Sequence, residues 1–423
     1  MTEEIERFLI VDDQDSVLLF FQVLLEELGY RSVYTANQGF EAQVAADRFE
    51  VQFVISSWEL KGMPGTVFVQ RLRSQRKYYN VPFLIYSKEM SDDERALVKD
   101  LGLPAVIKMP FDREAAKNMI QDLIAKENAL TDDEIRYRDM EAAFATNDVE
   151  GALKLATKRF VNESDLAYKV NTLLGEIYMS IGSLEKAEAA LMKSAKMNAD
   201  YLPNKYGLAK LYSMSQRHDK SIEILKEVQG ASPLNVKSIL SLGSAYLLSG
   251  DKNEAKEMLS KAEGLDPDSS DLMNEKAKVS LMEGDIEKTK EYIDQIASGD
   301  QLAREFNMIA IAMVANGEFE QGTEIYRKAI DLIGGKAKTY LLRYNLGLAY
   351  KKQGKLKSAF IEFAKSYIAE PTYEKAYVAI AKTHKIMKEK GIEVGSSAIK
   401  KIKNARSKAK SNADGEHQTT KVS

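Results

Sequence analysis

The feature that most constrains this chain is a residue pattern that recurs about every 34 residues between positions 168 and 371. In the four units that match best, a leucine is followed by a small residue, and a tyrosine comes three residues after the small one. The pairs of leucine and small residue are Leu174-Gly175, Leu208-Ala209, Leu242-Gly243 and Leu346-Gly347. Small residues let two helices approach closely, and a lone helical hairpin cannot bury its apolar face, so neighbouring units must stack. The pattern therefore predicts an all-α superhelical solenoid.

The repeating units begin near residues 133, 168, 202, 236, 270, 303, 340 and 374. Proline follows the second predicted helix of several units, as at Pro233, Pro267 and Pro371, because proline cannot continue a helix. The pattern resembles the tetratricopeptide repeat (TPR) over roughly residues 133–395. We expect a TPR array of about seven to eight helical hairpins at residues 128–395.

The resemblance to TPR arrays implies that protein partners bind the concave face, which the first helix of each hairpin lines. Counting outward positions on those helices gives the candidate residues Tyr206, Lys210, Asn274, Lys278, Asn307, Tyr344, Lys351 and Lys382. Lysines, amides and tyrosines together suit a peptide that carries acidic groups. The alternative is that these are ordinary solvated helix positions. Asn345 lacks the full set of partners with which chaperone-binding members grip a carboxylate, so we expect no chaperone binding.

The first 127 residues have a different pattern, in which short apolar runs alternate with amphipathic segments. Short, mostly apolar runs of three to five residues are typical of strands buried on both faces. The runs are 8–11, 32–34, 53–56, 83–87 and 105–107, and the predicted helices are 16–28, 39–47, 65–76, 91–101 and 112–126. We expect Ser16 to cap the first helix and Gly29 to end it. The alternation predicts an α/β domain with a parallel sheet covered on both faces.

Polar residues follow the predicted strands at their carboxyl ends, where ligands gather in such sheets. These residues are Asp12, Asp13, Ser57, Ser87 and Lys108. Together they resemble the site of the receiver domain of two-component response regulators, over roughly residues 5–125. The resemblance implies a flavodoxin-like (βα)5 fold for a domain at residues 1–127.

The resemblance also implies a chemistry in which three carboxylates hold Mg²⁺ and one of them accepts a phosphoryl group. Here Ser57 occupies the acceptor position, and a neutral hydroxyl needs an adjacent base before it can attack. We therefore expect no aspartyl phosphorylation and at most weak Mg²⁺ binding at Asp12 and Asp13. Two alternatives remain: Lys108 neutralises the aspartates as an ion pair, or Ser57 is itself modified. We expect no other cofactor.

Composition excludes several classes of function. The chain has no cysteine, which excludes disulfides and thiolate chemistry, and its three histidines are far apart in the sequence. No apolar run approaches the roughly 20 residues of a membrane span, and the first residues lack the pattern of a secretory signal. We therefore expect a cytoplasmic protein without a membrane partner.

Charge is distributed unevenly along the chain. Residues 1–127 carry 15 basic and 21 acidic side chains, whereas residues 385–423 carry 10 basic and 4 acidic ones. Residues 396–423 are expected to be a basic, disordered tail, with a last helix at 393–406 that caps the array as the alternative. The tail lacks interleaved aromatics, so nucleic-acid binding is not the favoured role.

Neither a nucleophile–base pair nor a phosphate-binding loop is present in the sequence, so we do not expect an enzyme. The favoured hypothesis is a bacterial-type signalling adaptor of two-component phosphorelay systems. Its pseudo-receiver head constitutively binds either another signalling protein or the array itself, and the array recruits a second partner. A homodimer through the receiver face is a further option. The alternatives are a switch driven by Ser57 phosphorylation or by metal at Asp12 and Asp13, and a nucleic-acid-associated regulator acting through the tail.

Overall fold

The structure is a computed structural model that describes residues 5–103, 105–110, 112–295, 299–315, 317–333, 339–395 and 399–407. It contains two compact units. The first unit is Met1–Ser249 with Ser260–Asp266, and the second is Gly250–Leu259 with Pro267–Ser423. The α/β domain and the first helical hairpins belong to the first unit, and the remaining hairpins belong to the second.

The α/β domain has a parallel five-stranded sheet in the order β2-β1-β3-β4-β5. The strands are β1 (Arg7–Val11), β2 (Ser32–Ala36), β3 (Phe53–Ser57), β4 (Phe83–Ser87) and β5 (Ala105–Lys108). All five were predicted from their apolar runs, because a strand covered on both faces must be apolar throughout. In this register Ser57 lies opposite Tyr86, and Ser87 lies opposite Lys108.

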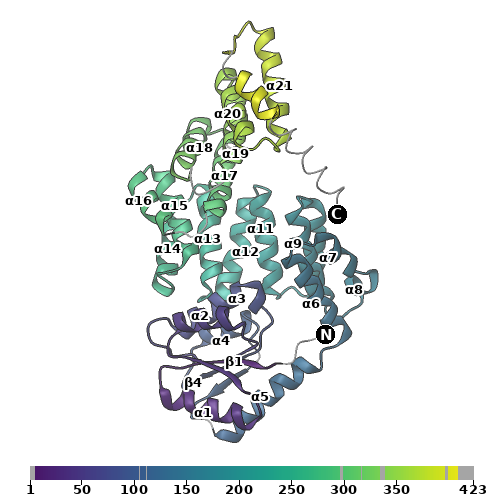
Figure 1. Ribbon diagram of the computed structural model, residues 1–423, viewed down its shortest axis with the longest axis vertical. Helices are drawn as coiled ribbons and strands as arrows, with labels where there is room; N and C mark the ends of the chain where they lie inside the picture. The colour runs from purple at the N-terminus through teal and green to yellow at the C-terminus, as the bar shows by residue number, and fades with distance from the viewer. Residues whose placement is uncertain are drawn as a thin grey trace. The chain divides into compact units, whose positions relative to one another are not determined.

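Helices cover both faces of the sheet (Figure 1). On one face α1 (Asp15–Glu27) and α5 (Arg113–Asn128) pack Phe21, Leu24 and Ile120 into a buried core. On the other face lie α2 (Gly39–Phe49), α3 (Gly65–Ser74) and α4 (Asp92–Asp100), and a short 3-10 turn, η1 (Arg76–Tyr78), follows α3. The arrangement is the flavodoxin-like (βα)5 fold.

The predicted cap of the first helix is wrong. Helix α1 begins at Asp15 with Gln14 at the N-cap, and Gln14 makes no side-chain capping hydrogen bond, so Ser16 lies inside the first turn. The predicted end is close, because the helix stops just before Gly29, which has a φ of 97°. A residue with positive φ cannot continue a right-handed helix, and glycine adopts such a φ without steric cost.

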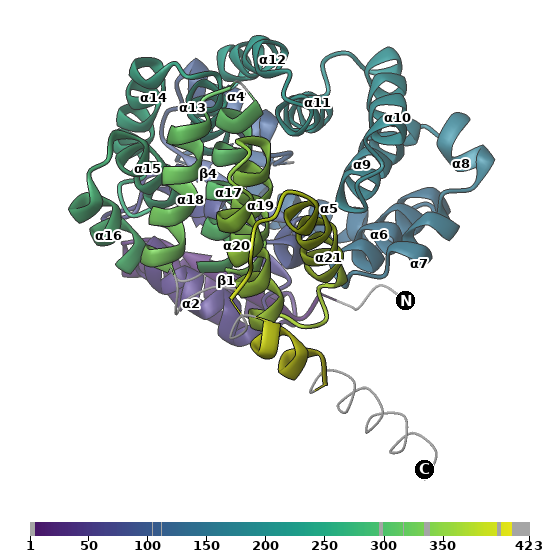
Figure 2. The same cartoon turned by 90° about the horizontal axis from the view of Figure 1, so that it is seen from above.

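Helical hairpins occupy the rest of the first unit, and Figure 2 shows α9 beside α10 and α11 beside α12. The helices are α6 (Asp132–Ala145), α7 (Val149–Leu155), α8 (Lys158–Asn162), α9 (Ala167–Ser180), α10 (Leu184–Met197), α11 (Leu202–Met214), α12 (His218–Ala231) and α13 (Val236–Ser249). Helix α14 (Lys252–Leu265) has residues in both units. These bounds agree with the starts predicted near residues 133, 168, 202 and 236.

The second unit continues the same pattern. Its helices are α15 (Ser270–Glu283), α16 (Ile286–Asp294), α17 (Gly299–Ala315), α18 (Phe319–Ile333), α19 (Tyr340–Lys352), α20 (Leu356–Ala369) and α21 (Glu374–Glu389). Residues 399–407 are also helical, and Ile402 is buried in the core of the last hairpin. The alternative of a capping helix therefore fits these residues better than a disordered tail, while 396–398 and 408–423 lie outside the described residues. The predicted domain boundary after residue 127 falls at the end of α5 and stays a prediction.

Small residues allow the two helices of a hairpin to pack closely. A Cβ atom built on Gly175 in α9 would lie 2.5 Å from Leu191 Cγ in α10. A Cβ atom on Gly347 in α19 would lie 2.6 Å from the ring of Phe363 in α20. Both distances are far below a normal carbon–carbon contact, so the helices can approach this closely only where the side chain is absent.

Within the first unit, the α/β domain is docked on the array through α3 and α4. Gln70 Nε2 donates to Leu234 O at 3.2 Å, and its Oε1 accepts from the N–H of Val236 at 2.8 Å. The Arg71 guanidinium forms an ion pair with Asp266, with Nε 3.0 Å from Oδ2. Asn235 donates to the Asp100 carboxylate at the end of α4. The loop between α12 and α13 therefore covers part of the α3–α4 surface.

Among the described residues, no helix is both long enough and apolar enough to cross a lipid bilayer.

We predict that Gly175→Ala lowers the free energy of unfolding by about 1–3 kcal/mol, because the added methyl group overlaps Leu191. Gly230→Ala in α12 is the matched control, since nothing lies within 4 Å of its Cβ position. It should be neutral or stabilising by up to about 1 kcal/mol, from helix propensity alone. Urea unfolding of the two variants checks this, and equal effects would show that the small residue is not a steric requirement.

We also predict that Gln70→Ala speeds amide hydrogen exchange at Val236, because it removes the side-chain oxygen that accepts this N–H. Gln43→Ala on α2 serves as the control, and it should leave exchange at Val236 unchanged. Unchanged protection in Gln70→Ala would mean that the α/β domain is not held on the loop between α12 and α13.

Candidate functional site

The five polar residues predicted at the strand ends occupy the carboxyl edge of the sheet. Asp12 and Asp13 follow β1, Ser57 ends β3, Ser87 ends β4 and Lys108 ends β5. They share one edge because all strands are parallel. The structure links Ser57 and Ser87 through Glu59, while Lys108 stays solvent-exposed.

Asp12 is almost fully buried, with 2% of its surface exposed. Its Oδ2 accepts from Tyr86 Oη at 2.6 Å, and its Oδ1 accepts from the N–H of Gln14 at 2.7 Å. Burial raises the pKa of Asp12, the two hydrogen bonds lower it, and the charges of Asp13 and Glu59 raise it, with a net increase. Both carboxylate oxygens therefore already have a donor from this chain.

Asp13 is paired with Lys61, whose Nζ lies 3.0 Å from Asp13 Oδ2. Lys61 comes from the loop after β3, where its side chain is 84% exposed. The ion pair that we expected from Lys108 is not found in the described part of the chain. The cation that accompanies the acidic pair comes from the neighbouring loop instead. No sequence pattern distinguishes Lys61 from other exposed lysines.

Ser57 is buried, and its hydroxyl donates to the backbone oxygen of Glu59 at 3.2 Å. The Glu59 side chain turns toward β4, where its Oε1 accepts from Ser87 Oγ at 2.6 Å and from the N–H of Lys88 at 3.1 Å. The Glu59 carboxylate therefore accepts the hydrogen bonds that Ser87 and Lys88 donate at the end of β4. Glu59 was not predicted as a site residue, because its place in the loop after β3 does not show which way its side chain turns.

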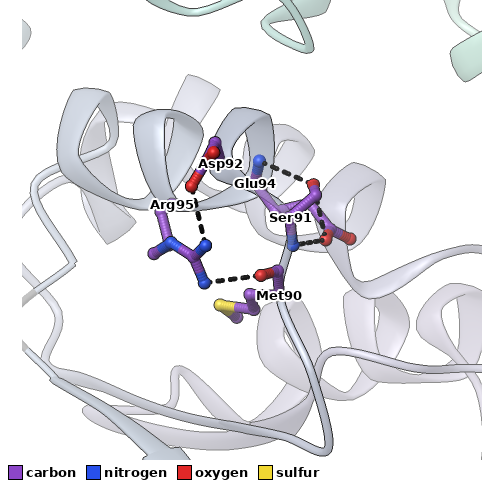
Figure 3. Close-up of polar contacts among 5 residues, drawn as sticks. All are labelled: Met90, Ser91, Asp92, Glu94 and Arg95. Carbon is purple, nitrogen blue, oxygen red and sulfur yellow. Dashed lines mark hydrogen bonds and ion pairs between the residues drawn. The ribbon is translucent and has the colours of Figure 1, made fainter.

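A second group of contacts fixes the start of α4 (Figure 3). Ser91 and Glu94 form a capping box, in which Glu94 Oε2 accepts from the N–H of Ser91 at 2.8 Å. Arg95 donates to Met90 O at 2.5 Å and to the Asp92 carboxylate at 2.7 Å, so the loop before α4 is tied to the first turn of the helix.

Trp58 connects this helix start to the end of β3. The indole Nε1 donates to Glu94 Oε1 at 3.0 Å, and the ring is 3% exposed. Partial burial raises the pKa of Glu94, but the hydrogen bonds from Ser91 and Trp58 outweigh that effect and hold it below its ordinary value. Glu94 is therefore ionised at neutral pH, which strengthens the contact with Trp58.

The arrangement does not fit a tightly held Mg²⁺. That ion needs octahedral oxygen ligands, and in receivers three carboxylates supply the protein share. Here the Asp12 oxygens accept hydrogen bonds, Asp13 is paired with Lys61, and Ser57 offers only a neutral hydroxyl. Over the described ranges, no group of three or more histidine, cysteine, aspartate or glutamate residues is placed to hold a metal ion. Weak binding at Asp12 and Asp13 stays a prediction.

The predicted concave-face residues differ in exposure. Lys210 and Lys382 are exposed, and Tyr206, Asn307, Tyr344 and Lys351 are half-buried. Asn307 Oδ1 accepts from Asn345 at 2.6 Å. The expected exposure is wrong for Asn274 and Lys278, which are 5% and 2% exposed. Lys278 lies 2.5 Å from Glu275 within α15, so its charge is already compensated. Partner binding by this set stays a prediction.

Comparison with known families agrees with the architecture. Residues 8–121 match the family described as "Response regulator receiver domain", and residues 168–201 and 236–269 match "Tetratricopeptide repeat". The chain therefore has a response-regulator receiver domain followed by TPR repeats. Receiver domains and TPR repeats are generally non-catalytic.

Curated relatives match the receiver part. Over 115 residues the chain is 31% identical to the CAI-1 autoinducer sensor kinase/phosphatase CqsS of Vibrio cholerae, covering 27% of this chain but only 17% of that protein. Over 119 residues it is 25% identical to a chemotaxis protein CheY homolog of Campylobacter jejuni, covering 28% of this chain and 92% of that protein. The CheY relatives point to two-component signalling.

Solved structures match each part separately. The chemotaxis response regulator CheY4 of Vibrio cholerae is 28% identical, with a TM-score of 0.27, covering 28% of this chain and 98% of that one. A tetratricopeptide repeat protein from Parabacteroides merdae is 15% identical, with a TM-score of 0.40, covering 60% of this chain and 98% of that one.

We predict that Asp12→Asn stabilises the fold at neutral pH. The pKa of Asp12 is higher in the folded state than in the unfolded state, so its contribution favours folding at low pH and is lost as pH rises through the folded pKa. An asparagine removes the buried charge beside Asp13 and Glu59. Its single oxygen can accept from the Gln14 N–H, and its amide N–H can donate to the Tyr86 hydroxyl, so both contacts are kept. Thermal melts of both proteins at pH 4 and pH 7 check this: the variant's advantage should be larger at pH 7, and an equal shift at both values would contradict it.

Proposed function

We propose that the protein is a non-enzymatic, cytoplasmic signalling adaptor with a fixed receiver-like head. A receiver domain joined to TPR repeats has a role in signalling or protein interaction. In this proposal the head is an atypical response regulator without the phospho-acceptor aspartate. The TPR array binds protein partners, and signals pass by contact because neither part performs chemistry on a substrate.

The observation that carries the proposal is the pairing of Ser57 with Glu59 at the carboxyl edge. Ser57 places a neutral hydroxyl where the receiver resemblance requires a carboxylate, and that hydroxyl donates to a backbone oxygen rather than to a base. Glu59 then uses the Ser87 hydroxyl and the Lys88 N–H. A phosphoryl group bound here would have to displace a carboxylate that makes two hydrogen bonds.

The contact between Trp58 and Glu94 supports a fixed head rather than a switch. It joins the end of β3 to the first turn of α4, and the capping box of Ser91 and Glu94 joins the same turn to the preceding loop. Moving α4 relative to β3 would break a hydrogen bond to an ionised carboxylate, which costs about 1.5–3 kcal/mol. This cost opposes a change of conformation in the absence of a covalent signal.

The contacts of α3 and α4 with the array indicate a role for a head that does not switch. Gln70, Arg71 and Asp100 bind the loop between α12 and α13 and the end of α14 within the first unit. In the proposal, the receiver-like head has the array as its own docking partner on this surface. Other protein partners bind the TPR concave face and the uncovered part of the head.

We predict that the wild-type protein takes up no phosphoryl group from acetyl phosphate with Mg²⁺, because residue 57 is a serine without a base. The double variant Ser57→Asp/Glu59→Ala, which restores a carboxylate and frees the donors of Ser87 and Lys88, should gain a phosphoryl adduct. Intact-mass spectrometry measures the adduct. Fluorescence of Trp58, the only tryptophan in the chain, reports whether the site moves.

Glu59→Ala alone is the matched control, and it should remain unmodified. A phosphoryl adduct on the wild-type protein that disappears in Ser57→Ala would replace the fixed-head proposal with a Ser57 switch. A saturable change of Trp58 fluorescence with Mg²⁺ alone, abolished in Asp13→Asn, would instead support a metal-driven switch.

A further inference from the structure

The second unit contains an apolar groove that none of the predicted concave-face residues lines. Its volume is about 810 Å³, and it lies between α20 and the segment that follows α21. The groove is lined by Arg343, Lys357, Phe360, Ile361, Ala364, Lys365, Ile368, Ala369, Met387, Glu393, Val394, Gly395 and Lys401. Seven of these side chains are hydrophobic, so the groove differs from an ordinary solvated surface.

An exposed apolar stripe of α20 forms one wall of this groove. Ile361 is 48% exposed and Ile368 is 40% exposed. Seven residues separate them, which is two turns of helix, so both side chains lie on the same side of α20, with Ala364 between them. Terminal repeats of solenoids normally present a polar outer face, because no further repeat covers them. An apolar stripe near the end of this array is therefore a surface that gains from being covered.

The rim of the groove is cationic. Arg343 Nη1 and Lys365 Nζ lie 3.2 Å and 2.6 Å from the two oxygens of the Glu362 carboxylate, so one acid compensates two bases. Lys357 and Lys401 form no ion pair within the described part of the chain. Glu393 is the single acidic residue among those that line the groove. Four cationic side chains therefore stand against two carboxylates, those of Glu362 and Glu393, around the apolar stripe.

We propose that this groove binds an amphipathic helix of another protein, whose apolar ridge covers Ile361 and Ile368 and whose acidic flanks pair with Lys357 and Lys401. Anchors spaced three, four and seven residues apart on a partner helix match a groove that is itself built on one helix. The chain's own residues 408–423 do not complement the cationic rim, because they carry three basic and two acidic side chains. An acyl chain is a poorer match, because the isoleucines remain open to solvent rather than enclosed.

The test uses the full chain and a fluorescein-labelled synthetic helical peptide of about 16 residues, with leucines at the anchor spacing and glutamates on the flanks. The control peptide has lysine in place of every glutamate. Fluorescence anisotropy should show the acidic peptide binding at least about tenfold more tightly than the basic one. Raising the salt concentration should reduce this difference, because exposed charges are screened.

Two variants of the groove distinguish its apolar and charged parts. The double variant Ile361→Ser/Ile368→Ser should weaken acidic-peptide binding by about tenfold or more, and Lys357→Glu/Lys401→Glu should reverse the peptide preference. The matched controls are Ile181→Ser, which alters a 50%-exposed isoleucine of the first unit, and Lys352→Glu, an exposed lysine outside the groove. Both controls should bind like the wild-type protein.

Three outcomes would overturn the proposal: no preference for the acidic peptide, unchanged binding by the isoleucine variant, or equal loss in the controls. A fourth contradicting outcome would come from light scattering, which measures the oligomeric state. A wild-type dimer that dissociates on Ile361→Ser/Ile368→Ser would show that a second copy of this chain covers the groove. The phosphodonor experiment does not involve the groove, so failure here leaves the fixed-head proposal untouched.

Discussion

The helical part of the protein depends on one steric constraint, the absence of a side chain where the two helices of a hairpin cross. Gly175 faces Leu191 and Gly347 faces Phe363 at distances that no Cβ atom can occupy. Close crossing lets the larger residue bury fully, and Leu191 and Phe363 are both 0% exposed. Hairpins of this shape leave apolar edges that only a neighbour can cover, and the array follows from that need.

In the receiver domain, the main constraint is electrostatic. Asp12, Asp13 and Glu59 bring three carboxylates to one edge of the sheet, and their mutual repulsion must be offset locally. Tyr86 and Gln14 offset Asp12, Lys61 offsets Asp13, and Ser87 with Lys88 offsets Glu59. Each of the three carboxylates therefore has donors or a cation supplied by the chain itself.

Much of the fold followed from the sequence because two periodicities are strong. Buried parallel strands must be continuously apolar, which located all five strands, and the 34-residue period located the hairpins. Parallel strands also place their carboxyl ends together, so Asp12, Ser57 and Ser87 were found on one edge. These inferences concern the path of the backbone. That path depends on which segments are buried, and the order of apolar residues along the sequence shows those segments.

Side-chain direction was much harder to predict, because it depends on neighbours far away in sequence. Tyr86 reaches Asp12 across the sheet, and Glu59 turns to Ser87 from a loop. Asn274 and Lys278 occupy outward positions of α15 by counting, yet they are buried. Counting residues along a helix shows on which side of that helix a side chain lies. It does not show whether a neighbouring helix covers that side.

A contact within the receiver and a contact with the array hold α4 at both of its ends. In the first unit, α4 contacts Trp58 at its first turn through Glu94 and Asn235 at its last turn through Asp100. A helix held at both ends can move only if both contacts break, and α3 adds Gln70 and Arg71 to the same interface. A phosphorylation-driven shift of α4 would therefore have to overcome the docking energy as well as its own barrier. In the adaptor proposal, Ser57 in place of an acceptor carboxylate removes the driving force for such a shift, and the head acts as a fixed extension of the array.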